Sequence, residues 1–296
     1  MNHFRNLVLP VSIIIGIFFH SYFDRLTSII PYLIFALLFI SFSNIELKKL
    51  KVSMFHFQLI LFQLFFSLGI YFILKLYDDS IAQGVLVTVL TPTATSAVVI
   101  AVMLGASLNT MVSYTLFCNL IVAIVAPILF SFIGEQINIG FWASFWLIFK
   151  KVFPILVLPL FLALAIKYIS PKTNRYIAKH QNISFYIWAV SLTIVVGRTI
   201  DFIYKQGSSK IGLIILMGII SMVLCFIQFS YGRYIGKKYG DVVAGGQSLG
   251  QKNTVLAIWM AQSYLLPLSS VIPALYVIWQ NLFNSYQLWK KNRKKG

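Results

Sequence analysis

Long apolar runs separated by short basic segments are the feature that most restricts what this chain can fold into. Residues 109–133, for example, contain no charged side chain. A helix needs about 20 apolar residues to cross the hydrocarbon core of a bilayer. The runs are continuous and do not alternate in polarity, which favours helices over the strands of a membrane barrel. Only 10% of the residues are charged, against roughly 25% in soluble proteins. We therefore expect an all-α membrane protein.

The hydropathy pattern predicts ten membrane spans in a single transmembrane domain that covers residues 1–296. They lie at about residues 6–23, 28–44, 53–75, 81–105, 109–133, 152–169, 183–204, 209–231, 242–264 and 267–289. The first is interpreted as an uncleaved span, because no small-x-small cleavage site follows it. Residues 142–151 are predicted to form an interfacial helix with aromatic anchors ahead of the sixth span.

The chain is expected to contain two repeats, about 1–135 and about 140–296. Five spans in each repeat, an odd number, would make the repeats inverted in the membrane.

The lysines and arginines are distributed unevenly between the two sides that this topology defines. Sixteen lie in segments on the side of the termini and six on the opposite side. The positive-inside rule then places both termini in the cytoplasm, which predicts a multi-pass protein of the cell (inner) membrane. Basic residues at the ends of apolar runs are typical of topology signals and of contact with anionic lipid, so no nucleic-acid partner is expected.

Two of the predicted spans, the fourth and the ninth, contain a break. Pro92 interrupts the fourth, because proline lacks an N–H group and clashes with the carbonyl four residues earlier. Three glycines, Gly245, Gly246 and Gly250, interrupt the ninth. The breaks occupy corresponding positions in the two repeats, which is the best sequence indication of the binding site of a secondary transporter.

Polar residues concentrate at these two breaks. The candidate substrate- and ion-binding residues are Gln63, Thr91, Thr93, Thr95, Ser96, Asn119, Gln247, Ser248, Gln251, Lys252, Asn253 and Thr254. A lysine in the middle of a span costs roughly 2.5–3.5 kcal/mol on insertion scales and is a functional hypothesis by default. No Asp or Glu lies in a span core, so Lys252 must be held by carbonyls, amide oxygens, water or a bound anion, unless it snorkels to an interface.

The threonine and serine hydroxyls have two interpretations. Individually, each can satisfy a backbone carbonyl freed at a kink. Taken together, the breaks present two half-helix N-termini, whose positive dipole ends suit an anionic substrate group.

Several of these motifs resemble those of the bile acid:sodium symporter family. The stretch from Ile30-Pro31 to Leu47-Lys48 resembles that family's second span and following loop, and Gln63 lies where the family has a glutamine. The segment 91–96, Thr-Pro-Thr-Ala-Thr-Ser, resembles the first crossover, Cys-Pro-Gly-Gly-Thr-Ala. The segment 250–254, Gly-Gln-Lys-Asn-Thr, resembles the second, and residues 273–281 resemble the tenth span.

This resemblance implies a panel domain, a core domain, and fourth and ninth helices that cross at mid-membrane to move an organic anion by alternating access. The sodium ligands that the family motif contains are largely not retained. Ser248 stands at the position of the acid in Glu-Val-Gly-Met-Gln-Asn, and Lys252 stands at that of the glutamine. Ala97-Val98 replace the family's Ser-Asn after the first crossover, while Gln63 is kept. A lysine ammonium in place of a ligand repels a sodium ion at close range.

The sequence thus predicts a secondary active transporter of a small organic solute, expected to be anionic, with neither a cofactor nor a metal centre. Lys252 is hypothesised to supply the charge that bound sodium supplies in relatives, and coupling to sodium, to protons or to no ion stays open. Alternatives are a carrier of the auxin-efflux or sodium/proton antiporter type, or a non-transporting membrane binding protein. A membrane enzyme is the weakest alternative, because the chain has no paired carboxylates, nucleophile elbow or Cys/His cluster. The oligomeric state is left open.

Overall fold

The structure is a computed structural model that describes residues 10–11, 14–134, 139–206 and 210–293. Within these ranges it is helical and contains no strand longer than one isolated bridge. The α-helices are α2 (His20–Phe23), α3 (Ile30–Phe42), α4 (Met54–Lys75), α5 (Asp79–Leu90), α6 (Thr95–Leu104), α7 (Leu108–Ile133), α8 (Phe141–Ile169), α9 (Pro171–Lys179), α10 (Asn182–Gln206), α11 (Ile211–Lys238), α12 (Val242–Gly250), α13 (Thr254–Tyr264) and α14 (Val271–Arg293). Short 3-10 turns are η1 (Asp24–Ile29), η2 (Leu47–Lys49) and η5 (Pro267–Ser270).

Six helices of the described part are long and apolar enough to cross a membrane, which confirms the all-helical membrane class. They are Arg25–Phe42, Met54–Lys75, Leu108–Ile133, Phe141–Ile169, Asn182–Lys205 and Ile211–Lys238. Each overlaps a predicted span. The predicted fourth and ninth spans are each divided into two shorter helices, α5 with α6 and α12 with α13. Residues 6–9 and 12–13 of the predicted first span lie outside the described residues.

The prediction of a separate interfacial helix over residues 142–151 is wrong. These residues are the first turns of α8, which continues to Ile169 and contains two prolines. Lys150 and Lys151 interrupt the apolar run, but both side chains are exposed and leave the packed face of Ile148 and Val152 uninterrupted. Two adjacent charges therefore do not end a helix that can point them away from its neighbours.

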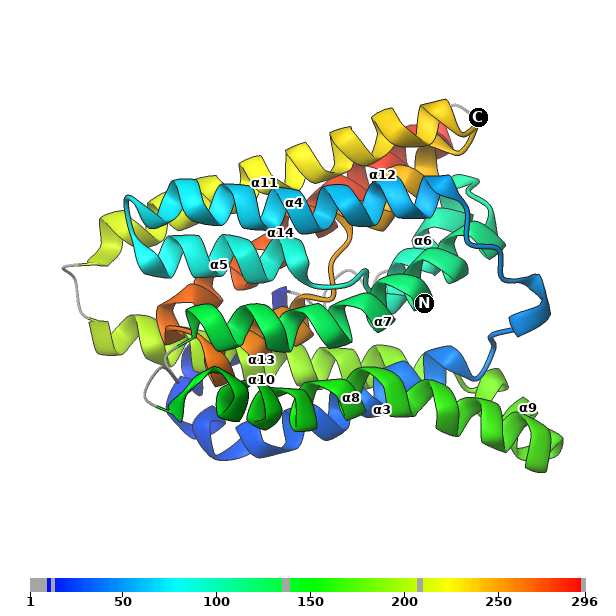
Figure 1. The fold of residues 1–296 in the computed structure, drawn as a ribbon, viewed down its shortest axis with the longest axis horizontal. Helices are drawn as coiled ribbons and strands as arrows, with labels where there is room; N and C mark the ends of the chain where they lie inside the picture. The colour runs from blue at the N-terminus through cyan, green and yellow to red at the C-terminus, as the bar shows by residue number, and fades with distance from the viewer. Residues whose placement is uncertain (1–9, 12–13, 135–138, 207–209, 294–296) are drawn as a thin grey trace.

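The helices are arranged in layers that run roughly parallel to one another (Figure 1). In one layer α3 packs against α8 and α10, and α2 packs against α10. In the opposite layer α4 packs against α5, and α11 packs against α14. The half-helices α6 and α13 and the helix α7 lie between these layers, and α13 contacts both α10 and α14.

Glycines allow α11 and α12 to approach until their backbones touch. A Cβ atom added at Gly245 would overlap the carbonyl oxygen of Gly232, and one at Gly250 would overlap the ring of Phe229. Gly236 faces Asp241 and Val242 in the same way. Small residues let membrane helices pack closely without a hydrophobic driving force. The glycines of the second break therefore serve packing within the chain.

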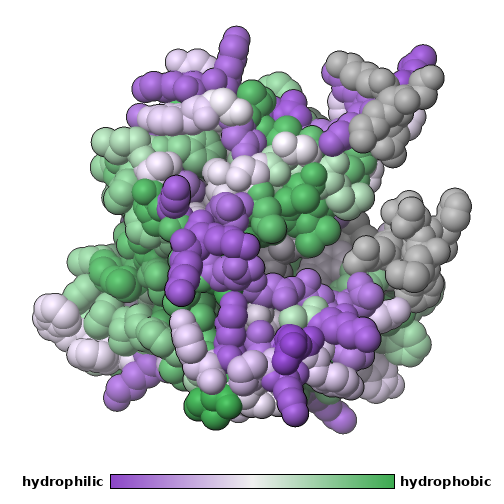
Figure 2. Space-filling model, turned by 90° about the vertical axis from the view of Figure 1, so that its right-hand side faces the viewer, coloured by the Kyte–Doolittle hydropathy of each residue, from purple (hydrophilic) through white to green (hydrophobic). Residues whose placement is uncertain are grey.

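Basic residues gather at one end of the molecule. The loop with η2, the helix α9 and the C-terminal ends of α11 and α14 all lie at this end (Figure 1). Figure 2, which views the molecule from there, shows hydrophilic residues across the face and hydrophobic residues around its flanks. Such an apolar belt with a charged end is the surface expected of a chain that crosses a bilayer.

Candidate functional site

The two breaks are short extended segments between half-helices. The helix α5 ends at Leu90, and Thr91 leaves the helical conformation with ψ 139°. Pro92 has no N–H group to continue the hydrogen bonds of the helix, so the chain stays extended until α6 begins at Thr95. The helix α12 ends at Gly250, and Gln251 is extended with φ −100° and ψ 100° before α13 begins at Thr254.

The extended segments cross and pair with each other in antiparallel fashion. Thr93 and Lys252 form a β-bridge. The Ala94 N–H donates to the Gln251 carbonyl at 3.0 Å, and the Asn253 N–H donates to the Pro92 carbonyl at 2.9 Å. An unsatisfied backbone group in the membrane costs several kcal/mol. Each break therefore supplies the hydrogen-bond partners that the other break has lost, which confirms that the two broken helices meet.

Lys252 lies at the centre of the crossing and is fully buried, with 0% of its surface exposed. Its Nζ donates to the Val89 carbonyl at 2.8 Å, in the last turn of α5. Its backbone N–H donates to Oε1 of Gln280 at 2.9 Å. The alternative that Lys252 snorkels to an interface is therefore wrong, and a carbonyl holds the ammonium as expected. The C-terminal end of a helix carries partial negative charge, so α5 offers a cation a favourable position.

Gln63 from α4 binds the same end of α5. Its Nε2 donates to the Leu90 carbonyl at 2.6 Å, and the Tyr114 hydroxyl donates to its Oε1 at 3.1 Å. Nε2 also lies 3.5 Å from the Cys118 sulfur. The last carbonyls of α5 are thus shared between the Gln63 amide and the Lys252 ammonium. The prediction that Gln63 belongs to the site is consistent with this contact, although its ligand role stays a prediction.

The equivalent end of α12 is held by a similar pair of side chains. The Tyr276 hydroxyl donates to the Gly250 carbonyl at 2.7 Å. The Gln228 Nε2 from α11 donates to that hydroxyl at 3.0 Å. At each break a glutamine from the preceding span is hydrogen-bonded to a tyrosine from the following span. One member of the pair, Gln63 at α5 and Tyr276 at α12, binds the last carbonyl of the first half-helix.

The hydroxyls of the first break bind in different ways. Thr91 donates to the Val87 carbonyl of its own helix at 2.6 Å, so its hydroxyl satisfies a backbone carbonyl at the kink. Thr93 donates across the crossing to the Ser248 carbonyl at 2.6 Å. The exposed Ser96 accepts a hydrogen bond from Gln251 Nε2 at 3.1 Å. Thr95 is partly exposed and makes no side-chain hydrogen bond with another described residue.

Most polar side chains of the second break form hydrogen bonds with other parts of the protein. Asn253 caps α13, its Oδ1 accepting from the Leu256 N–H at 3.3 Å. Ser248 donates to the Met111 sulfur at 3.6 Å. Gln247 donates to Asn284 at 2.9 Å, one turn before the crossing. Thr254 is buried and has no side-chain hydrogen bond within the described ranges.

One predicted residue, Asn119, is not brought into the crossing by any hydrogen bond. Its Nδ2 donates to the Thr115 carbonyl of its own helix α7 at 2.7 Å, and its Oδ1 is buried without a partner among the described residues. Four contributors were missed: Tyr114, Gln228, Tyr276 and Gln280. A polar residue in an apolar span was the available signal for Gln280, but tyrosines are common in this chain and nothing local distinguishes these two.

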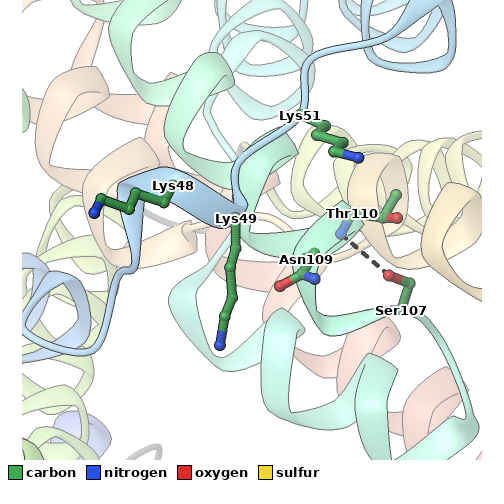
Figure 3. A pocket seen from close by; sticks show the side chains of 6 residues that line it. All are labelled: Lys48, Lys49, Lys51, Ser107, Asn109 and Thr110. Atoms are coloured by element: carbon green, nitrogen blue, oxygen red, sulfur yellow. Dashed lines mark hydrogen bonds between the residues drawn. The ribbon is translucent and has the colours of Figure 1, made fainter.

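A basic cavity of about 540 Å³ opens at the charged end of the molecule. Three lysines of the loop before α4, Lys48, Lys49 and Lys51, line one side (Figure 3). The start of α7 lines the other, where the Ser107 hydroxyl caps the helix by accepting from the Thr110 N–H at 3.3 Å. Lys49 also pairs with Glu46 at 2.9 Å and holds the pKa of that carboxyl below its usual range. The cavity keeps a net positive lining.

Comparison with known proteins bears on the identity of this arrangement. A search of curated proteins gives no match. The family described as the sodium bile acid symporter family matches residues 31–206, which is more than half of the 296 residues. The matched region contains Gln63 and the first break, and it ends before the second break begins. With its apolar helices and its interrupted fourth span, the chain belongs to the sodium bile acid symporter family, whose members are membrane transporters.

Proposed function

We propose that the chain is a secondary active transporter that moves an organic anion by alternating access, with the Lys252 ammonium in place of a bound sodium ion. The observation that carries this proposal is the position of Nζ, buried at the crossing and 2.8 Å from the Val89 carbonyl. Carbonyl oxygens at the end of a half-helix are the ligands that transporters of this design offer to a sodium ion. Here the chain's own cation occupies one of them.

The proposal includes ten spans built as two inverted repeats. The six long helices, the two broken pairs, α14 and the segment at 6–23 together make ten. The paired caps support the repeat: Gln63 and Tyr114 serve α5, and Gln228 and Tyr276 serve α12. We place both termini on the cytoplasmic side of the inner membrane, because the lysine-rich segments share one end of the molecule.

Electrostatics favours a site that works without sodium. Two unit charges 4 Å apart repel by about 4 kcal/mol at an effective dielectric of 20. A sodium ion bound on the carbonyls around Val89 would meet this repulsion from Lys252. The cycle therefore runs either uncoupled or coupled to protons, with Lys252 as the group that would lose and regain a proton.

Two features suit an anionic solute. The N-terminus of α6 has no side-chain cap at Ala94, and beside it Thr95 is partly exposed and Ser96 is exposed. Uncapped N–H groups at a helix start attract carboxylate or phosphate oxygens. At the charged end, the lysines of the basic cavity would raise the local concentration of anions. The solute itself is identified only by this chemistry.

Uptake into proteoliposomes tests the proposal. Wild-type protein is expected to accumulate a radiolabelled organic anion equally in sodium and in choline buffer, and Lys252→Met is expected to stop uptake. Lys75→Met, at the exposed end of α4, is the matched control and should transport normally. A pH gradient then distinguishes proton coupling from uncoupled flux. Sodium-dependent uptake that survives Lys252→Met would overturn the proposed role of Lys252, and binding without flux under any gradient would overturn transport.

The anion for this assay can be found by thermal shift. A ligand that binds only the folded protein stabilises it by about 2.7 kcal/mol at one hundred times its Kd. Organic anions are compared with neutral analogues of the same size, with and without sodium. Stabilisation by anions alone, unchanged by sodium, is the expected pattern.

A further inference from the structure

A second cavity, of about 330 Å³, lies away from the crossing, where the ends of α6, α11 and α14 meet the start of α12. Its polar and aromatic lining consists of Arg233, Phe283, Tyr286, Gln287, Lys290 and Lys291. None of the described carboxylates lines it. Three cations therefore face one small space without a compensating negative charge from the cavity wall.

Arg233 is fixed in this cavity by contacts on several sides. Its Nη2 donates to Oε1 of Gln287, which is itself 8% exposed. The guanidinium lies 5.6 Å from the centre of the Phe283 ring, and the side-chain stem packs against Gly246. Its Nε is buried and has no partner among the described residues. A guanidinium held by its neighbours with a donor to spare is suited to a phosphate, which it binds through two parallel hydrogen bonds.

The two lysines differ in how far they are already engaged. Lys291 donates to the Met103 carbonyl at 2.9 Å, near the end of α6. Lys290 is exposed, lies over the Tyr286 ring at 6.0 Å from its centre, and has no carboxylate partner in the described structure. Lys290 is thus free to turn towards a ligand that Arg233 holds. Together they can neutralise one phosphate group.

The surroundings of the cavity indicate that the phosphate belongs to a lipid. Along α14, Leu282, Tyr286 and Trp289 are each more than half exposed. They are spaced four and three residues apart and therefore form one outward stripe. The exposed Arg293 lies over the Trp289 ring. Exposed tyrosine and tryptophan beside lysine and arginine are typical of the headgroup level of a bilayer, and basic pockets between helices at this level bind anionic headgroups.

We propose that this cavity binds the phosphate of an anionic phospholipid, held by Arg233 and Lys290, with the acyl chains along the exposed stripe of α14. The site does not depend on the proposed transport activity. A polar path leads inward from it: Gln287 and Gln247 both donate to Asn284 Oδ1, at 3.5 and 2.9 Å. A bound lipid would therefore fix α11, α12 and α14 relative to one another beside the crossing.

Native mass spectrometry and thermal shift of the purified full-length protein test this site. After delipidation in detergent, the protein is titrated with phosphatidylglycerol, phosphatidylcholine or inorganic phosphate. Phosphatidylglycerol is expected to remain bound and to raise Tm, whereas phosphatidylcholine and phosphate at the same concentration are not. Lys290→Gln, an exposed change that leaves the fold intact, is expected to weaken phosphatidylglycerol binding several-fold, and Arg233→Gln at least tenfold.

The matched control is Lys237→Gln with Lys238→Gln, which removes two exposed charges from the end of α11 outside the cavity. This variant should bind phosphatidylglycerol as wild type does. Three results would overturn the proposal. The first is equal binding of the two lipids, and the second is an equal Tm shift with inorganic phosphate, which would indicate a soluble-anion site. The third is an equal loss in the control variant, which would indicate general surface attraction.

Discussion

Replacing Lys252 with methionine separates its role in function from its role in stability. A lysine in the centre of a span costs about 2.5–3.5 kcal/mol. The contact with Val89 returns about 1.5–3 kcal/mol as a hydrogen bond from a charged donor, and the helix end adds about 0.3–1 kcal/mol. These contributions nearly cancel. We therefore expect Lys252→Met to leave the free energy of unfolding within about 1 kcal/mol of wild type while it abolishes transport.

Lys252→Ala provides the comparison, because it also removes the three buried apolar heavy atoms that methionine keeps beyond Cβ, a methylene, the sulfur and a methyl. At about 0.8 kcal/mol each, their loss lowers the free energy of unfolding by about 2.4 kcal/mol relative to the methionine variant. At about 2–4 °C per kcal/mol, this corresponds to a Tm roughly 5–10 °C lower in a detergent melt. A methionine variant destabilised by more than about 3 kcal/mol would refute the reasoning, since the ammonium would then be a main element of stability. Equal Tm values for the two variants would show that the stem is not packed.

Three further tests address the packing and hydrogen bonds of the crossing. Gly245→Ala is expected to lower the free energy of unfolding by about 1–3 kcal/mol, because its methyl group overlaps the Gly232 carbonyl; Gly69→Ala, where a Cβ meets nothing within 4 Å, should not lower it. Thr93→Val removes the hydrogen bond to the Ser248 carbonyl and should cost about 1 kcal/mol more than Thr88→Val, whose hydroxyl binds its own helix; equal losses would contradict a bridging role for Thr93. Gln63 and Tyr114 share one hydrogen bond, so the combined effect of Gln63→Leu and Tyr114→Phe on the free energy of unfolding in a double-mutant cycle should depart from the sum by about 0.5–3 kcal/mol, and strict additivity would argue against that bond.

The breaks could be located from the sequence because their causes are local. Pro92 removes a backbone donor at its own position, and the glycines near 245 mark where two backbones can touch. The partner of Lys252 could not be located in this way. Val89 is an ordinary apolar residue whose backbone carbonyl, not its side chain, accepts the hydrogen bond, and the two residues are 163 positions apart.

The boundary of α8 shows the opposite difficulty. Hydropathy placed its start at residue 152, because Lys150 and Lys151 interrupt the apolar run. The direction in which a side chain points depends on the neighbouring helices, which a linear average does not include. Tyr276 was missed for a related reason. Its hydroxyl lies at the crossing only because α14 returns past the end of α12.

The antiparallel pairing of the breaks also dictates an order of events during biosynthesis. The Pro92 carbonyl and the Ala94 N–H reach the membrane long before the ribosome has made Gln251 and Asn253, their eventual partners. Until then the first break must keep its backbone groups near water or in contact with the insertion machinery. The N-terminal half is therefore expected to insert without completing its fold. Protection of Ala94 from hydrogen exchange would arise only after the last helices are in place, which makes crossing formation a late, long-range step in folding.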